Sequence, residues 1–397
     1  MTNLKIVNAP STPSAVGDGP AAASDTTAEP LQAAPVAAVS VPQARTTDPV
    51  AAAPPAGVPV HVRIARILRL LGLTWFVPLV NLCAGENPRA QLRAIWLMIG
   101  VPTVFFALFL LVWGWSASRV HTSLGTIPGP VQVVQEAGIL LDEHRAARAK
   151  EAAFMARQQR SAENAAGESG AVTPVRRYTG KPTYLDQIRT SLFTVFTGFV
   201  IATLVAVPLG ILCGMSPVIN TAINPLIQIF KPVSPLAWLP IVTMVVSAVY
   251  VTGDDAWFEK SFVTSAITVT LCSLWPTLIN TALGVASVDR DLLNVGRVLR
   301  LGRRTQITRI ILPSSLPLIF TGMRLSLGVG WMVLIAAEML AQNPGLGKFV
   351  WDEFQNGSSH SLGRIMVAVF TIGIIGFLLD RVMLTLQQLL SFGDNRI

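Results

Sequence analysis

Six apolar runs of about 20 residues recur along this 397-residue chain, and each is long enough to cross roughly 30 Å of hydrocarbon as a helix. Segments in lipid must satisfy their own backbone hydrogen bonds, and no ten-residue alternation suggests a barrel, so the runs predict helices. The sequence therefore predicts an all-α integral membrane protein whose spanning domain occupies 94–391. The expected spans are about 94–115, 189–213, 233–252, 263–286, 315–339 and 365–388.

Composition agrees with a chain that lies mostly in lipid, since 51% of its residues are hydrophobic and only 13% are charged. The net charge is +8, but the basic residues flank apolar runs, which argues against nucleic-acid binding. Cys83, Cys213 and Cys272 lie in or beside apolar runs without metal-ligand spacing. We therefore expect small hydrophobic residues there, and no metal site.

Residues 1–60 are rich in Ala, Pro, Ser, Thr and Val and poor in charged and aromatic residues. Such a segment cannot bury enough apolar surface to offset the entropy of ordering, so it predicts a disordered tail. The first residues contain no continuous apolar core, which excludes a signal peptide.

Residues 61–93 combine apolar residues with features that interrupt a span: Arg66 and Arg69 come early, and Pro78 and Asn81 follow. The pattern favours an amphipathic elbow helix that lies in the cytoplasmic interface. The alternative is a further span, because the hydrophobic length is nearly sufficient.

Arginines crowd the segment before the first span and the loop 289–313 between the fourth and fifth spans. Positive residues mark the cytoplasmic side, and six spans bring both segments to that side, so both termini are expected inside. The loop 116–188 is also basic yet is expected outside, since loops longer than about 60 residues escape this rule. Within this periplasmic insertion we expect a surface helix at 131–157 and a flexible return at 167–182.

No catalytic motif accompanies the spans. The nearest candidate for a phosphate-binding loop, Gly345 to Phe349, lacks the first glycine and the hydroxyl that would hold magnesium. There is no HExxH or GxSxG motif. We expect a chain that is not an enzyme, has no catalytic residue and binds no cofactor, so that any uphill movement is driven by a partner.

The loop DRDLLNVGRVLRLGRRTQITRIILPSSLP, residues 289–317, resembles the EAA loop of bacterial ABC importer permeases, a short helix that docks on the ATPase subunit. The family pattern is Glu-Ala-Ala, three residues and Gly, closing downstream in Leu-Pro. Counting back from Pro313, the first three positions are Asn294, Val295 and Gly296, and the family glycine is replaced by Arg300.

Single arginines in this loop are explained by the charge rule, which holds the positive side inward. The loop as a whole predicts docking, because Leu299 and Ile307 provide apolar anchors beside a dense basic face. The expected coupling residues are Asn294, Val295, Gly296, Arg297, Leu299, Arg300, Gly302 and Pro313.

The resemblance extends over about 120–391, through segments such as TIPGPVQVV (126–134) and NPLIQIFKPVSPLAWLPIVTM (224–244). It covers permeases for nitrate, taurine, alkanesulfonates, cyanate and bicarbonate. The segments LCSLWPTLINTALGV (271–285) and AAEMLAQNPGLGKFVWDEF (336–354) are most similar to nitrate importer permeases.

This resemblance implies a six-helix type I ABC importer transmembrane domain in a bacterial inner membrane, forming the path for nitrate or nitrite. The implied partners are a second copy of the chain, cytoplasmic ATPase subunits that use ATP and Mg, and a periplasmic or lipid-anchored anion-binding protein. The alternatives are sulfonate or taurine, cyanate or bicarbonate as substrate. A membrane scaffold or sensor without transport is the alternative from another class.

An ionisable group at bilayer depth is costly, so it is paired, reaches the interface or serves function. Arg324 lies eleven residues past Pro313, roughly 16 Å into its helix and near mid-membrane, with no acidic residue of that helix in reach. Lys231 precedes two prolines that interrupt a helix, and broken helices of this kind line pathways. The alternative is that its long side chain reaches the membrane interface. The expected substrate path contains Lys231, Trp238, Arg324 and Trp331.

Glu338 shares a helix face with Arg324 and Trp331, because the three recur at a spacing of seven residues. Glu338 and Arg324 are about 21 Å apart along the axis and cannot neutralise each other. We expect Glu338 near the outer mouth, as a water-exposed carboxylate or as a partner for Lys348.

Overall fold

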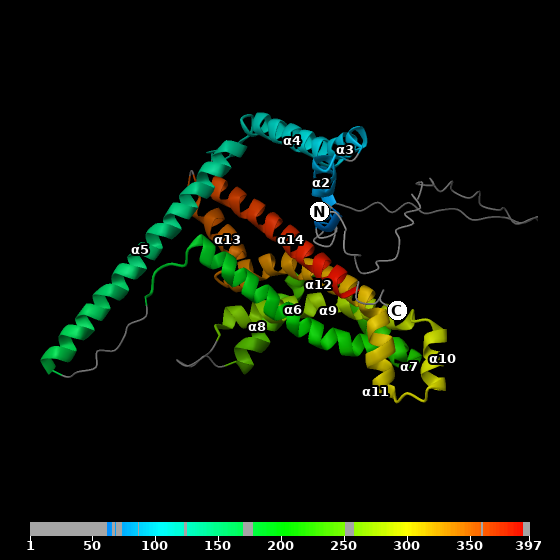
Figure 1. The fold of residues 1–397 in the computed structure, drawn as a ribbon. Helices are drawn as coiled ribbons and strands as arrows, with labels where there is room; N and C mark the ends of the chain where they lie inside the picture. The colour runs from blue at the N-terminus through cyan, green and yellow to red at the C-terminus, as the bar shows by residue number, and fades with distance from the viewer. Residues whose placement is uncertain are drawn as a thin grey trace, which may run out of the picture. The chain divides into compact units, whose positions relative to one another are not determined.

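In a computed structural model of the chain, the structure describes residues 62–65, 68, 74–85, 87–122, 125–169, 178–250, 258–358 and 360–391. The predicted tail 1–60, together with Arg66 and Arg69 of the predicted elbow, lies outside these residues. The described part is helical apart from one antiparallel pair of two-residue strands (Figure 1). In chain order the elements are η1 (Thr74–Phe76), α2 (Val77–Cys83), α3 (Pro88–Ile95), η2 (Trp96–Gly100), α4 (Val101–Ala117), β1 (His121–Thr122), β2 (Gly125–Thr126), α5 (Pro130–Ser169), α6 (Tyr184–Met215), α7 (Pro217–Phe230), α8 (Pro235–Val249), α9 (Lys260–Ala286), α10 (Arg290–Val298), α11 (Arg303–Gln306), η3 (Ile307–Ile311), α12 (Leu312–Ala341), α13 (Leu346–Asn356) and α14 (Ser361–Ser391).

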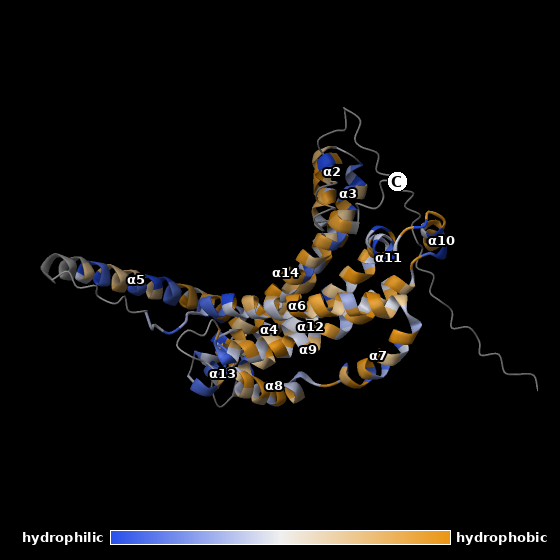
Figure 2. Ribbon diagram, turned by 90° about the horizontal axis from the view of Figure 1, so that it is seen from below, coloured by the Kyte–Doolittle hydropathy of each residue, from blue (hydrophilic) through white to orange (hydrophobic). Residues whose placement is uncertain are grey.

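Five helices of the described part are long and apolar enough to cross a membrane, and the bent pair α7 and α8 makes a sixth if it counts as one span. The expectation of an all-α membrane protein is confirmed. Figure 2 shows predominantly hydrophobic residues along α7 and α8, and hydrophilic stretches along α5. The five long helices are Pro88–Ala117, Tyr184–Met215, Lys260–Ala286, Arg303–Ala341 and Ser361–Leu390.

The predicted third span, 233–252, differs from the helix in the structure. It corresponds to α8, whose 15 residues cover only about 22 Å, and α8 is bent by 100° from the preceding α7. The break falls where Pro235 begins α8, and Ser234 accepts a hydrogen bond from the Leu236 backbone at 3.3 Å. One straight span is therefore replaced by two helical pieces.

The end of the predicted elbow belongs to the first long helix. Helix α3 begins at Pro88 and runs through the π-helical turn η2 into α4, so residues 88–93 form one helix with the first predicted span. Before it, α2 is a separate short helix, and the chain leaves it through Gly85, whose φ of +78° suits glycine.

The centre of the molecule is a close packing of α6 against α9, which lie side by side in Figure 1. Small residues recur at every fourth position of α6, as in helix pairs that approach closely in membranes. A Cβ on Gly210 would lie 2.6 Å from the Thr281 Cβ, and one on Gly198 would lie 2.7 Å from Val269. The small residues are Gly198, Ala202, Ala206, Gly210 and Gly214.

Helix α12 also packs on α9, and it bonds to two backbone groups of α9 that flank Pro276. The Ser326 hydroxyl accepts from the Thr277 backbone N–H at 3.0 Å and donates to the Ser273 carbonyl at 2.5 Å. A neighbouring serine thus satisfies both backbone groups, as lipid-embedded proline kinks require. Gly322 and Gly330, one turn to either side, allow this close approach.

The insertion 116–188 contains a longer helix than predicted. Helix α5 has 40 residues, so the expected surface helix 131–157 is present but continues through 167–169, where a loop was expected. The rest of that expected return lies partly outside the described residues.

Arg364 of α14 ties the first part of α5 to the bundle. Its guanidinium contacts Glu143 of α5 and lies 3.4 Å from Glu353 of α13 and 3.9 Å from Glu136 of α5. His360 adds a contact of 2.6 Å to Glu136. One arginine therefore joins three helices at one end of α14.

Candidate functional site

The loop predicted to couple with a partner forms a helical hairpin. The Asp289 side chain caps α10 by accepting from the Asp291 N–H at 3.0 Å. Leu293 packs into a small cluster that includes Val285 and Ile311. Gly296 is buried against the returning segment, where an added Cβ would lie 3.0 Å from Ile310 Cδ1. The inner face of α10 thus packs against the end of α9 and against η3.

Helix α10 ends in a Schellman motif at the position of the family glycine. The Leu301 N–H bonds to the Gly296 carbonyl at 3.0 Å, and the Arg300 N–H bonds to the Arg297 carbonyl at 2.9 Å. Arg300 takes a φ of +48°, the left-handed conformation that favours glycine. The family pattern has glycine at this position because the backbone there is left-handed. Arg300 adopts the same conformation at a steric cost that glycine does not have.

The outer face of α10 presents apolar side chains without a partner in the described part of the chain. Leu292, Val295, Val298 and Leu299 are exposed, and Val298 is 82% exposed. We call these four residues the α10 apolar stripe. The Arg297 guanidinium donates to Asn294 Oδ1 at 3.3 Å within the helix. Gly302 is the N-cap residue of α11, and Pro313 lies in the first turn of α12. An exposed apolar stripe beside arginines has the composition of a docking surface.

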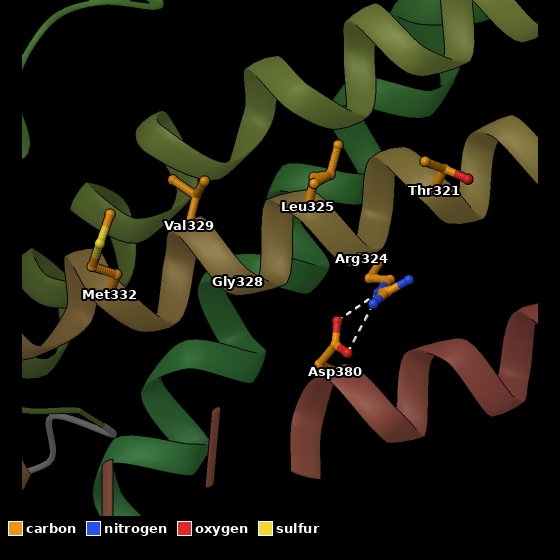
Figure 3. A pocket seen from close by; sticks show the side chains of 7 residues that line it. All are labelled: Thr321, Arg324, Leu325, Gly328, Val329, Met332 and Asp380. Atoms are coloured by element: carbon orange, nitrogen blue, oxygen red, sulfur yellow. Dashed lines mark hydrogen bonds and ion pairs between the residues drawn. The ribbon is translucent and has the colours of Figure 1, made fainter. Parts of the chain in front are cut away.

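Arg324 of α12 was expected to have no acidic partner on its own helix, but the structure pairs it with Asp380 of α14. Figure 3 shows the two side chains pointing toward each other. Arg324 Nε lies 2.5 Å from Asp380 Oδ1, and Nη2 lies 2.9 Å from Oδ2. The bond is bidentate, the geometry in which a guanidinium recognises a carboxylate most strongly.

This ion pair lies in the wall of an open cavity of about 510 Å³. Side chains of α12 form most of the wall, and Asp380 is contributed by α14 (Figure 3). Both charged side chains remain 36% exposed. The lining residues are Thr321, Arg324, Leu325, Gly328, Val329, Met332 and Asp380.

The other residues expected in the substrate path do not line this cavity. Lys231 is exposed at the end of α7, next to Phe230, whose ring packs on Trp238 at 5.6 Å. Trp331 is buried, and its Nε1 donates to the Ile372 carbonyl of α14 at 3.0 Å. Arg324 and Trp331 both belong to α12, but only Arg324 lines the cavity, whereas Trp331 packs against α14.

The expectation of a water-exposed Glu338 is wrong. Glu338 is fully buried and accepts from the Ser191 hydroxyl of α6 at 2.8 Å and from the Gly347 backbone N–H at 3.0 Å. The Leu346 N–H in turn donates to the Ser191 hydroxyl at 2.8 Å. Lys348 pairs with Asp352 at 2.9 Å instead. Glu338 therefore caps the start of α13 and joins it to α6 and α12.

Two residues of these sites were missed from the sequence, Asp380 and Ser191. A signal for Asp380 existed, because it is an acidic residue inside the apolar run GIIGFLLDRVML and needs a cation at similar depth. Ser191 carries no such signal, since a serine in a membrane helix is common and usually bonds within its own helix.

These features define a class: a multi-span membrane protein with an ion-paired arginine in a cavity between helices and a helical hairpin that exposes apolar side chains. The sequence profile of the family described as "Binding-protein-dependent transport system inner membrane component" matches residues 206–392. The nitrate import permease NrtB of Synechococcus elongatus is 34% identical over 205 residues, covering 52% of this chain and 69% of that protein.

Two further relatives are similar over about half of the chain. NrtB of Leptolyngbya laminosa is 36% identical over 194 residues, covering 49% of this chain and 64% of that protein. The bicarbonate transport permease CmpB of Synechocystis sp. is 36% identical over 209 residues, covering 52% of this chain and 69% of that protein. The chain belongs to the family of inner membrane components of binding-protein-dependent transport systems, the permease subunits of ABC importers.

Proposed function

We propose that this permease forms the transmembrane path for a small planar oxyanion, with nitrate as the first candidate. The observation that carries the proposal is Arg324, whose guanidinium opens into the α12 cavity within a membrane-spanning helix. A planar fork of N–H donors fits two coplanar oxygens of a trigonal anion. Relatives named as nitrate and bicarbonate permeases support the same class of substrate.

Bicarbonate is the second candidate, because it has the same planar arrangement of oxygens and because relatives of equal similarity are named for it. Sulfonates and taurine are less suited to a single planar fork, since their three oxygens are not coplanar with the sulfur. Cyanate is linear, so it presents only one terminal atom at a time to the two N–H donors of the fork. A scaffold without transport would need the Arg324–Asp380 pair only as a contact between helices, and would not need the cavity beside it.

The working assembly would contain two copies of this chain, ATPase subunits and an anion-binding receptor. The α10 apolar stripe and its flanking arginines are the surface suited to an ATPase groove. The charge rule orients this hairpin, and both termini, toward the cytoplasm of a bacterial inner membrane. The long loop that contains α5 would then face the receptor side.

The decisive test is uptake by cells that lack their own nitrate importer and express this chain with its ATPase and receptor. Labelled nitrate is expected to accumulate, and unlabelled bicarbonate or nitrite, but not taurine, is expected to compete. A matched strain carrying an ATPase with an inactive phosphate-binding loop controls for leak. Accumulation of taurine in place of nitrate, or of no anion at all, would refute the proposal.

A further inference from the structure

The Arg324 fork is occupied by a group that has the shape of the proposed substrate. A carboxylate and a trigonal oxyanion both present two coplanar oxygens at similar spacing, and Asp380 presents its pair to Arg324 Nε and Nη2 at 2.5 and 2.9 Å. The donors that would hold an anion are therefore filled from within the protein.

The pair is accessible in a way that a purely structural ion pair need not be. Both side chains are 36% exposed, whereas the Arg364 side chain, which joins three carboxylates, is only 23% exposed. The cavity of about 510 Å³ beside the pair has room for a small oxyanion with several waters, since each water takes about 30 Å³ of liquid.

Other contacts already hold α12 to α14 on both sides of the pair. Toward one end, Trp331 Nε1 donates to the Ile372 carbonyl at 3.0 Å. Toward the other end, Gln387 Nε2 donates to the Pro317 carbonyl at 3.1 Å and to the Thr321 hydroxyl at 3.2 Å. The joint between the helices therefore does not depend on the ion pair alone.

We propose that Arg324 and Asp380 form an oxyanion site in which Asp380 is a built-in competitor: a planar anion binds Arg324 only by displacing the Asp380 carboxylate. A carrier must bind its cargo weakly enough to release it. Competition by a tethered carboxylate lowers the apparent affinity by the fraction of time that the fork is free. This inference rests on the proposed class of substrate and adds the residue that sets affinity and release.

The test is anion-dependent thermal stability of the purified permease in lipid nanodiscs. Asp380→Asn keeps the shape of the side chain but removes its charge and one of its two acceptor oxygens, so the competitor of the anion is a single neutral acceptor. Replacing chloride by about 100 mM nitrate is then expected to raise the melting temperature by ~3 °C or more in this variant and by less than ~1 °C in the wild type.

Two controls separate this effect from general loss of charge. Asp352→Asn removes the carboxylate of another ion pair, that with Lys348, and is expected to respond to nitrate as the wild type does. Arg324→Gln combined with Asp380→Asn removes the fork as well and is expected to abolish the response. In transport assays Asp380→Asn is expected to lower both the KM for the anion and the maximal rate, because release slows.

The proposal is overturned if Asp380→Asn responds to nitrate no more than the wild type, or if the double variant responds equally. It is also overturned if Asp380→Asn does not fold, because a carboxylate displaced in each cycle is not one on which the fold depends. These readouts need no transport. A permease that fails to import nitrate in cells contradicts the proposed function, while the anion response of the purified variants still decides the role of Asp380.

Discussion

Two ionisable side chains of α12 are stabilised in different ways. Arg324 is paired with a carboxylate in an open cavity, whereas Glu338 is fully buried and held by a hydroxyl and a backbone N–H. The first arrangement leaves a charged group accessible to a ligand, and the second leaves none. Accessibility therefore assigns Arg324 to the candidate path and Glu338 to the architecture at the start of α13.

Glu338→Ala is expected to lower the free energy of unfolding by about 2–4 kcal/mol, because it leaves the Ser191 hydroxyl and the Gly347 N–H unsatisfied beside a new cavity. The melting temperature and folded yield in detergent measure the loss. Asp352→Ala, which breaks a partly exposed pair, is the control and is expected to cost less than about 1 kcal/mol. Equal losses in the two variants would contradict the buried role of Glu338.

Arg324→Lys is expected to reduce anion uptake about 10- to 100-fold while the complex still assembles, since lysine keeps the charge but loses the planar fork. Arg324→Ala is expected to abolish uptake. Initial uptake rates at equal membrane abundance measure the effect. Arg145→Lys, at an exposed position of α5, is the matched control and is expected to transport normally. Unchanged uptake in Arg324→Ala would remove Arg324 from the path.

Arg300→Gly is expected to stabilise the hairpin by about 0.5–1 kcal/mol, because glycine adopts the left-handed conformation without the steric penalty that arginine has. Thermal unfolding of the purified chain measures the change. The contrasting variant is Arg304→Gly, within α11, which is expected to destabilise because glycine is unfavourable inside a helix. If both variants destabilise alike, the strain at Arg300 is not significant.

At the scale of elements, α9 depends on its neighbours for its own backbone bonding. Proline 276 interrupts the helix, and α12 supplies the hydroxyl that satisfies the two freed groups. Helix α6 also packs closely on α9, through its row of small residues. Close approach and backbone repair thus hold α6 and α12 on α9, and α12 provides most of the wall of the Arg324 cavity.

Ser326→Ala is expected to destabilise the bundle by about 1–3 kcal/mol, since the Thr277 N–H and the Ser273 carbonyl lose their partner away from water. Chemical denaturation followed by tryptophan fluorescence measures it. Ser118→Ala, which removes an exposed hydroxyl bond to the Trp115 carbonyl, is expected to change stability by less than about 0.5 kcal/mol. A neutral Ser326→Ala would show that the kink needs no such bridge.

At the scale of the molecule, two surfaces of the permease are suited to partners at different places along the chain. The α10 apolar stripe lies on a hairpin that packs against the ends of the core helices, and η3 continues this hairpin directly into α12. The α5 segment is held to α13 and α14 by Arg364. Both surfaces are thus connected by direct contacts to α12 or α14, the helices that line the cavity.

Val298→Glu is expected to abolish ATP-driven uptake while the chain still inserts, because a carboxylate at the most exposed position of the α10 apolar stripe opposes burial in an apolar groove. Co-purification of the ATPase with the permease and uptake rates measure it. Val134→Glu, at a valine of α5 that is 72% exposed, is the control and is expected to retain the ATPase. Normal co-purification of Val298→Glu would exclude the stripe as the docking surface.

The helical class, the apolar runs and the arginine in the middle of one of these runs can all be read from the amino-acid sequence. These follow from hydrophobic length and from the cost of charge in lipid, which are local properties of the chain. The sequence also predicts a coupling role for the loop 289–313, where Arg300 adopts a left-handed φ of +48° at the position that is glycine in the family pattern.

Which polar groups meet depends on how the helices pack together. Asp380 lies 56 residues from Arg324, and Ser191 lies 147 residues from Glu338, so no local pattern records either pairing. The 100° bend between α7 and α8 likewise depends on what packs around the prolines, since a proline permits a kink but does not set its angle. Pairing and bending are properties of packed helices, whereas hydropathy describes each helix alone. This is why Glu338 was expected at the surface and why the partner of Arg324, which lies on another helix, was not predicted.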